Sequence, residues 1–369
     1  MQEKQILIAP DSFKGSLSAA EAAAAIARGL AAQGIRDTYC LPIADGGEGT
    51  LDALVPREKQ VELTVTGTAG KPVVAAYGCS GKTAVIEMAR AAGLTLTPEG
   101  ERNVLSATTF GVGEMIRHAL DAGYRIFLLT VGGSGTNDGG CGMMAALGVT
   151  FYAADGSAFI PTGGTLDRIA RIDTKGLDNR LAECRFTIAT DVKNPLLGEN
   201  GATYVYAKQK GCAAEDLPRM EAGMAHYAAL LQSLCHTDVS NVAGCGAGGG
   251  ISAPLVGLLE APICSGIEAV LKASCFERMV RGADAVITGE GRIDRQSLFG
   301  KAISGVATTA AKHGVPVYVL AGCLGDDRDA LLNMGLADIR TLTELSHDTA
   351  YCMDHAAELL ERLASELKL

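Results

Sequence analysis

The sequence predicts an α/β fold, because short apolar runs that suit buried strands alternate with helix-like segments at both ends of the chain. The first such unit is an apolar run at 5–9, a polar loop and a helix that begins at the capping box Ser18-Ala-Ala-Glu21 and ends near Gly34. From residue 61 the pattern changes to three strand-like runs, VELTVTG, PVVAAYG and TAVIEM, with turns and no helix between them. That pattern is typical of an antiparallel meander.

The alternating pattern returns after residue 283 as strand, loop, helix and strand, followed by one more strand and a helical tail. We therefore expect both chain ends, 1–60 plus 281–369, to form one discontinuous, doubly wound (Rossmann-like) α/β domain. Residues 61–280 then form an inserted mixed α/β domain, and 369 residues suffice for about two domains. A cleft between the domains is the expected place for a site.

Further elements are expected from apolar runs and turn residues along the chain. Strands are predicted at 39–43, 126–131, 186–189 and 203–206, and helices after residue 50 and at 140–147.

The composition argues against several classes of protein. Hydrophobic residues make up 48% of the chain and charged residues 20%, which is enough to build a folded core. The net charge of −10, without a dense run of Lys or Arg, argues against a nucleic-acid partner and an anionic membrane. The polar start lacks a signal-peptide pattern, and no apolar stretch approaches the roughly 18 residues of a membrane span. Eleven cysteines without a C-x-x-C pair suggest reduced thiols in a cytoplasmic protein.

Two segments resemble phosphate-binding motifs but lack the required context. AYGCSGKT at 76–83 has Ala76 where the P-loop pattern needs its first glycine, and strand-like runs flank it, so we expect a hairpin turn. GCGAGGG at 244–250 satisfies G-x-G-x-x-G without a clear strand before it, which argues against dinucleotide binding. The six histidines fall into no hydrolase or zinc motif.

A third segment, GGSGTNDGG at 132–140, has the expected context, because it follows an apolar strand and precedes a helix that Asp138 could cap. Backbone N–H groups at a helix N-terminus bind anions well. We call residues 132–140 the glycine loop and predict that it binds an anion, either a carboxylate or a phosphate.

Four other apolar runs are each followed by a polar loop, and these loops share a composition. The loops are residues 9–16, 44–50, 189–195 and 288–301. In open α/β sheets, ligands bind outside the carboxyl ends of strands. Carboxylates, cations and glycine turns together suit Mg²⁺–nucleotide chemistry. The candidate charged residues that these loops offer include Asp11, Lys14, Asp45, Glu48, Asp191, Lys193, Glu290, Arg292, Asp294 and Lys301.

Taken together, these loops resemble the bacterial glycerate kinase family, type I. The matching segments occur in family order over nearly the whole chain: IAPDSFKGSLSA, PIADGGEGT, GGSGTNDGG, DVKNPLLGENGA and TGEGRIDRQSLFGKA. The chain departs from the family pattern at Val112, at Ala207-Lys208 in place of Gly-Pro, and in the glycine cluster at 244–250. These departures affect local loop shape.

The resemblance implies ATP-dependent phosphorylation of D-glycerate with Mg²⁺, usually to 2-phosphoglycerate, with 3-phosphoglycerate as the alternative product. From residue type and loop position, Asp191 is the predicted base and Asp294 the second choice. Lys14 and Lys301 are assigned to phosphate oxygens, and Asp45, Glu290 and Asp294 to Mg²⁺. The remaining predicted binding residues are Asp11, Ser12, Gly46, Gly47, Gly132, Gly133, Ser134, Gly135, Thr136, Asn137 and Asp138.

Two other functions have weaker support in the sequence. A nicotinamide-dependent 2-hydroxyacid oxidoreductase needs a strand, a G-x-G-x-x-G turn and a helix near the N-terminus, and APDSFKGS does not supply that turn. A non-catalytic sugar-acid binding module would bind glycerate without carboxylates placed for a metal. The sequence leaves the oligomeric state open.

Overall fold

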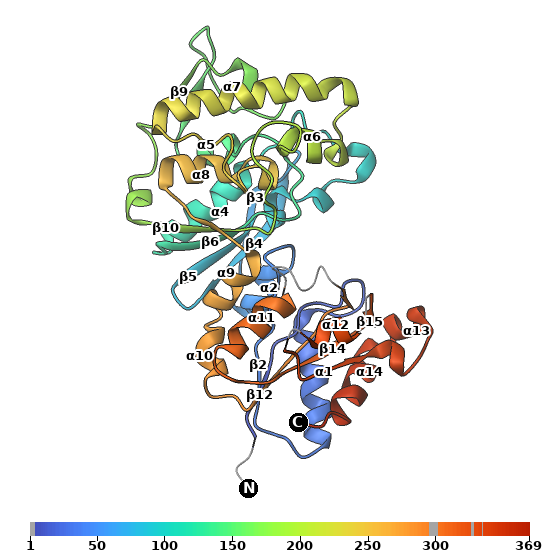
Figure 1. The fold of residues 1–369 in the computed structure, drawn as a ribbon. Coiled ribbons are helices and arrows are strands. Elements are labelled where there is room, and N and C mark those ends of the chain that lie inside the picture. The colour runs from blue at the N-terminus through green and yellow to red at the C-terminus, as the bar shows by residue number, and fades with distance from the viewer. Residues whose placement is uncertain (1–3, 295–301, 326–327, 334) are drawn as a thin grey trace. The chain divides into compact units, whose positions relative to one another are not determined.

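The computed structural model describes residues 4–294, 302–325, 328–333 and 335–369 (Figure 1). The chain divides into two compact units. Unit 1 consists of Met1–Asp45, Asp52–Leu54 and Ser265–Leu369, and unit 2 of Gly46–Leu51 and Val55–Cys264. The predicted domain boundaries, after residues 60 and 280, lie further along the chain than the two main points where the chain passes between the units, after Asp45 and after Cys264. The assignment of domains stays a prediction.

Unit 1 is built on a five-stranded sheet in which every neighbouring pair of strands is parallel. Ile6 lies opposite Ala285, so segments from both ends of the chain share this sheet. The α/β class and the parallel sheet drawn from both chain ends are therefore confirmed. The strands, in spatial order, are β2 (Thr38–Cys40), β1 (Ile6–Ile8), β12 (Ala285–Thr288), β14 (Val317–Ala321) and β16 (Asp338–Thr341).

Helices cover both faces of this sheet. Ile6, Ile8 and Ile287 pack on one face with α1 (Ala19–Ala32) and α14 (Ala356–Ser365), which run side by side (Figure 1). Leu7 and Val286 pack on the other face with α9 (Gly266–Ala273), α10 (Phe276–Val280) and α11 (Ala302–Ala311). Burial on both faces explains why the central strands β1, β12 and β14 are mostly apolar instead of alternating. The predicted capping box is present at the start of α1.

The strand order places a topological switch point in the middle of the sheet. In chain order the five strands stand 2-1-3-4-5, the flavodoxin-like type of open α/β sheet. The chain moves outward from β1 to β2 on one side and from β12 to β14 and β16 on the other. The connections from β1 and β12 therefore lead to opposite sides of the sheet, and ligands bind at such a switch point.

Unit 2 contains a six-stranded mixed sheet. The predicted meander is confirmed, because β3 pairs antiparallel with β4 and β4 with β5. The P-loop-like segment forms part of β4, a two-residue turn and β5, which is the expected hairpin. From β5 onward the neighbouring pairs are parallel. In spatial order the strands are β11 (Ile263–Cys264), β10 (Arg185–Ala189), β6 (Ile126–Thr130), β5 (Thr83–Glu87), β4 (Pro72–Ser80) and β3 (Val61–Thr66).

One predicted strand is wrong. Residues 203–206 belong to helix α6 (Ala202–Tyr206), which begins after Gly201 and packs against α7 (Leu217–Cys235). The β-branched and aromatic side chains of this segment favour a strand locally, but tertiary contacts override that weak preference. Within the described residues, no helix has the length and hydropathy needed to span a membrane.

A glycine at the end of β12 lets two strand ends approach closely. A Cβ on Gly289 would lie 1.9 Å from the backbone oxygen of Leu320 in β14. We expect Gly289→Ala to lower the free energy of unfolding by about 1–3 kcal/mol, because backbone must move to admit the methyl group. Urea unfolding followed by circular dichroism measures this change.

Gly100→Ala is the matched control, since nothing lies within 4 Å of a Cβ at that exposed position. Equal unfolding midpoints for the two variants would contradict the close approach of β12 and β14.

Candidate active site

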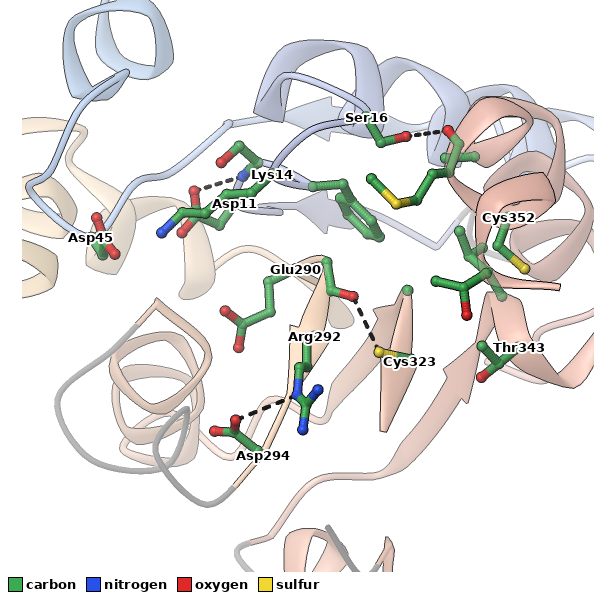
Figure 2. A pocket seen from close by; sticks show the side chains of 18 residues that line it. Asp11, Lys14, Ser16, Asp45, Glu290, Arg292, Asp294, Cys323, Thr343 and Cys352 are labelled. Carbon is green, nitrogen blue, oxygen red and sulfur yellow. Dashed lines mark hydrogen bonds and ion pairs between the residues drawn. The ribbon is translucent and has the colours of Figure 1, made fainter. Parts of the chain in front are cut away.

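Unit 1 has a pocket of about 370 Å³ at the carboxyl edge of its sheet. The loops that follow all five strands contribute lining residues, among them Asp45 after β2 and Gly322 after β14. One part of the lining is charged and carries Asp11, Lys14, Asp45, Glu290, Arg292 and Asp294 (Figure 2). Another part is apolar and includes Phe13, Leu342, Met353 and Ala356. The volume lies within the roughly 300–1,000 Å³ that is usual for small-molecule sites.

Backbone hydrogen bonds hold the loop after β1 against the loop after β12. The Asp11 N–H donates to the Gly289 oxygen at 2.8 Å, which continues the β1–β12 pairing beyond the strand ends. Two residues later the buried Phe13 ring anchors a tight turn, in which the Phe13 N–H donates to the Leu17 oxygen. Lys14 lies in this turn with its side chain exposed at the pocket. The loop is therefore fixed at both ends, and its cation can reach a ligand.

The carboxylates of this pocket act on one another electrostatically. Burial, and after it the charge of Asp45, raise the pKa of Asp11 to about 7, with Glu290 adding to the rise. A hydrogen bond from the Ser12 N–H and the charge of Lys14 oppose this effect. Negative charge thus exceeds positive charge around Asp11, which is the environment that a divalent cation neutralises.

The residues of the pocket suit Mg²⁺ bound together with phosphates. Among the described residues, no group of three His, Cys, Asp or Glu side chains is close enough to hold a metal ion alone. Mg²⁺, however, usually takes one or two carboxylates and completes its shell with water and substrate phosphates. Asp45 and Glu290 fit that role. Asp294 is paired with Arg292, with 3.7 Å between Oδ2 and Nε.

The raised pKa of Asp11 predicts a pH-dependent stability. Because the native carboxyl holds its proton up to about pH 7 while the unfolded one loses it near 3.8, the native state loses stability as pH rises between these values. We expect Asp11→Asn to unfold at higher urea concentration than the wild type, with an advantage that grows from pH 4 to pH 7 and is constant above. Urea unfolding of metal-free protein at several pH values measures this.

Mg²⁺ serves as the second variable of that experiment. Adding Mg²⁺ at pH 8 should stabilise the wild type more than Asp11→Asn. Only the wild type has the negative charge of Asp11 beside those of Asp45 and Glu290. An advantage of Asp11→Asn that does not change with pH would contradict the assigned coupling.

Unit 2 carries the glycine loop, which connects β6 to α5 (Cys141–Ala146) as predicted. Asp138 is buried and accepts hydrogen bonds from the N–H groups of Gly140 and Gly142 at the helix start. It also accepts two from the amide and hydroxyl of Thr109. Burial raises the pKa of Asp138, and these four donors lower it. Asp138 thus accepts from the first turn of α5, although Gly140 and not Asp138 is its N-cap residue, and it also ties the loop to the start of α4 (Phe110–Asp121).

Several polar groups of the glycine loop have no partner among the described residues. The N–H groups of Gly132 and Gly133, half-buried and exposed, donate to no acceptor in the part of the chain that the structure describes. The buried Thr136 Oγ1 and Asn137 Oδ1 are likewise without partners there. Gly133 has φ +70°, a backbone conformation that turns its amide away from the strand direction. Unpaired polar groups at this density mark a place where water or a ligand binds.

Glu87, at the end of β5, orders the segment that contains Gly46 and Gly47. Its buried carboxylate accepts hydrogen bonds from the N–H groups of Gly49 and Leu51 at 3.0 and 2.9 Å. A Cβ on Gly132 would lie 3.0 Å from the Cα of Gly47, so this segment lies directly against the glycine loop. Sequence reasoning missed Glu87, because a single acid at the end of an apolar strand carries no motif.

Lys210 is the second residue that sequence reasoning missed. It is 2% exposed, and its Nζ donates to the Ser134 Oγ at 2.8 Å and to the Thr136 oxygen at 2.7 Å. Burial lowers the pKa of Lys210 to about 7, although the charge of Asp138 opposes this. The sequence did offer a signal for Lys210. It lies in Gln-Lys-Gly at 209–211, which matches the end of the family run from which Ala207-Lys208 departs.

The predicted site residues fall into two groups. Unit 1 brings Asp11, Ser12, Lys14, Asp45, Glu290 and Asp294 to one pocket. Unit 2 holds Gly46, Gly47, the glycine loop and Asp191, which is exposed in the loop after β10. Lys301 lies outside the described residues. The roles assigned to these residues, and an interdomain location of the site, stay predictions.

Comparison with known proteins identifies the family. A model described as the glycerate kinase family matches residues 6–368. The chain belongs to the glycerate kinase family. It is 44% identical over 368 residues to a glycerate kinase of Bacillus subtilis (strain 168), a match that covers 98% of this chain and 96% of the relative.

Two further matches agree with this assignment. The chain is 44% identical over 328 residues to a glycerate 2-kinase of Escherichia coli (strain K12), with 88% of this chain and 86% of the relative covered. A crystal structure assigned as glycerate kinase 2 from Salmonella typhimurium LT2 superposes with a TM-score of 0.87 at 41% identity, covering 99% of this chain and 97% of that one. The resemblance stated from the sequence motifs is confirmed. The protein is a glycerate kinase, a phosphotransferase, for which the family implies ATP as donor and glycerate as acceptor.

Proposed function

We propose that the protein transfers the γ-phosphoryl group of ATP to the 2-hydroxyl of D-glycerate with the assistance of Mg²⁺, giving 2-phosphoglycerate. The observation that supports ATP as the donor is the pocket of unit 1. Lys14, an excess of carboxylates and an apolar surface all line this pocket. The E. coli relative named a glycerate 2-kinase supports the choice of hydroxyl.

The charged half of the unit 1 pocket suits the polyphosphate and its metal. Phosphoryl transfer depends on positioning and on charge neutralisation, since the transition state spreads negative charge over the phosphate oxygens. Mg²⁺, when bound, would help to neutralise this negative charge. Asp45 and Glu290 are the proposed Mg²⁺ contacts, with Asp294 as a further one, and Lys14 is the proposed contact to phosphate.

The apolar half of the same pocket suits a nucleobase. Phe13 and Leu342 are buried, and Met353 projects from α13 (Thr349–Asp354), whose backbone accepts a hydrogen bond from the Ser16 hydroxyl. Aromatic and thioether groups pack well on flat heterocycles. We propose that the adenine ring occupies this half.

The acceptor belongs, in this proposal, to unit 2. The unpaired amides of Gly132 and Gly133 can donate to an anion, and Asp191 has an exposed carboxylate in the next loop along the sheet edge. A base must reach the substrate hydroxyl within about 2.6–3.2 Å to take its proton. Asp191 is the proposed base, and Asp294 is the alternative.

A coupled assay tests the reaction and the position of transfer. ATP, Mg²⁺ and D-glycerate are supplied, and pyruvate is detected through enolase and pyruvate kinase, with and without phosphoglycerate mutase. We expect pyruvate without the mutase, because enolase accepts 2-phosphoglycerate directly. Pyruvate only with the mutase would show 3-phosphoglycerate as the product, and the absence of ADP formation would exclude glycerate as the acceptor.

A further inference from the structure

A second, smaller pocket in unit 2 has a buried cation in its wall. It has a volume of about 60 Å³ and lies between the segments 68–69, 94–107 and the glycine loop, with Lys210 in its wall. One water needs roughly 10–15 Å³ of such space, so the pocket admits a few waters or one small polar group. A nucleotide, which needs a site of about 300 Å³ or more, does not fit.

Lys210 has hydrogen-bonding capacity to spare in this pocket. Its ammonium group has three donors, and two of them are used by Ser134 and Thr136. No third acceptor is within hydrogen-bond distance among the residues described by the structure. A buried ammonium with an unused donor is costly unless an anion or water completes its shell.

Arg102 brings a second cation to the same pocket. Its Nε donates to the Thr97 oxygen at 3.3 Å, and its Nη1 donates to the Gln209 oxygen at 3.4 Å. The second bond holds the guanidinium against the turn that carries Lys210. A Cβ on Gly211 would lie 2.1 Å from the Arg102 oxygen, so the two segments are in direct backbone contact. Among the described residues that line the pocket, Glu101, which is exposed, is the only carboxylate.

We propose that this pocket binds the carboxylate of glycerate, with Arg102 and Lys210 as its cationic partners. The inference rests on the proposed function and adds to it the place of the substrate's charged end. Two cations against one exposed carboxylate favour an anion, and the small volume selects a carboxylate over a nucleotide phosphate chain. Ser134, in the glycine loop, accepts a hydrogen bond from Lys210. The lysine in the pocket wall is therefore bound directly to the glycine loop.

The low pKa of Lys210 adds a separate signature. With a pKa of about 7, the lysine is mostly neutral at pH 8, and a bound carboxylate favours its charged form. Binding of D-glycerate at pH 8 should therefore take up protons, which calorimetry detects as a binding enthalpy that depends on the buffer. Asp138 is the charged group that acts on this lysine, and Arg102 and Glu101 are the other charged residues that line the pocket.

Steady-state kinetics with Arg102 variants test the proposal. Arg102→Gln should raise the KM for D-glycerate about 10- to 100-fold, the loss expected for one charge-assisted hydrogen bond, with a small change in kcat and in the KM for ATP. Arg102→Lys, which keeps the charge, should restore part of the loss. Glu101→Gln should leave the KM unchanged or lower it, and Lys208→Met, an exposed lysine in the same turn, is the matched control.

Inorganic phosphate, used as a probe, distinguishes the substrate from an unrelated anion. Phosphate should compete with D-glycerate in the wild type and more weakly in Arg102→Gln. An active Arg102→Gln enzyme with an unchanged KM for D-glycerate would overturn the inference and leave the proposed function intact. Arg102-dependent inhibition by phosphate that is not competitive with glycerate would also overturn it. A wild-type enzyme that does not phosphorylate glycerate would instead overturn the function.

Discussion

Replacing Lys14 with methionine is expected to lower kcat/KM for ATP by about 10²–10³-fold, the usual effect of removing one preorganised charge from a transition state. Lys14 is the cation that the turn after β1 presents at the unit 1 pocket, opposite an excess of carboxylates. Methionine keeps most of the side-chain length and the apolar contacts of the stem. The loss therefore reports the charge and not the packing.

The measurement is steady-state kinetics with ATP varied at saturating D-glycerate. Lys82→Met is the control, because Lys82 is an exposed lysine in the β4–β5 turn, the position that the P-loop-like segment would assign to phosphate. We expect near-normal turnover from Lys82→Met. A severe loss there, together with an active Lys14→Met enzyme, would reverse the assignment of the two lysines.

Asp191→Asn is expected to lower kcat by about 10²–10⁴-fold, the range over which a general base contributes. Asparagine has nearly the same shape but cannot accept the proton of the substrate hydroxyl. Asp191 is exposed in the loop after β10, outside the unit 1 pocket, so the binding of ATP should change little. Single-turnover phosphoryl transfer and the Kd for ATP, measured on the same preparation, separate the two effects.

Asp294→Asn is the comparison that decides between the two candidate bases. Asp294 lines the unit 1 pocket and is paired with Arg292, so its loss should weaken binding of Mg²⁺–ATP more than it slows transfer. Near-normal turnover of Asp191→Asn would remove that residue from the role of base. A loss of kcat in Asp294→Asn without weaker ATP binding would assign the base to Asp294.

Much of the secondary structure follows from local patterns in the sequence. The run Ile6–Ile8 is apolar because both of its faces are buried, and the capping box at Ser18 marks the start of α1 because it satisfies free amides. The meander after residue 61 and the hairpin at 76–83 follow from turn residues and from the absence of a helix between strands. These signals act over a few residues, so a single sequence is enough to predict the elements.

The case of 203–206 shows the limit of such signals. The valine, threonine and tyrosine side chains of this segment fit a strand, but the segment forms α6, which begins after Gly201 and packs on α7. Local preference is worth a fraction of a kcal/mol per residue, and tertiary packing outweighs it.

By itself, the sequence determined the α/β class, the position of the polar loops after the strands and the family to which the chain belongs. The tertiary structure decided which of those loops meet. Asp11 and Glu290 line one pocket only because β1 pairs in parallel with β12, from the opposite end of the chain, and pairing over such a distance leaves no local trace. The same holds for the burial of Lys210 beneath the glycine loop, because the environment of a side chain is set by segments remote in sequence.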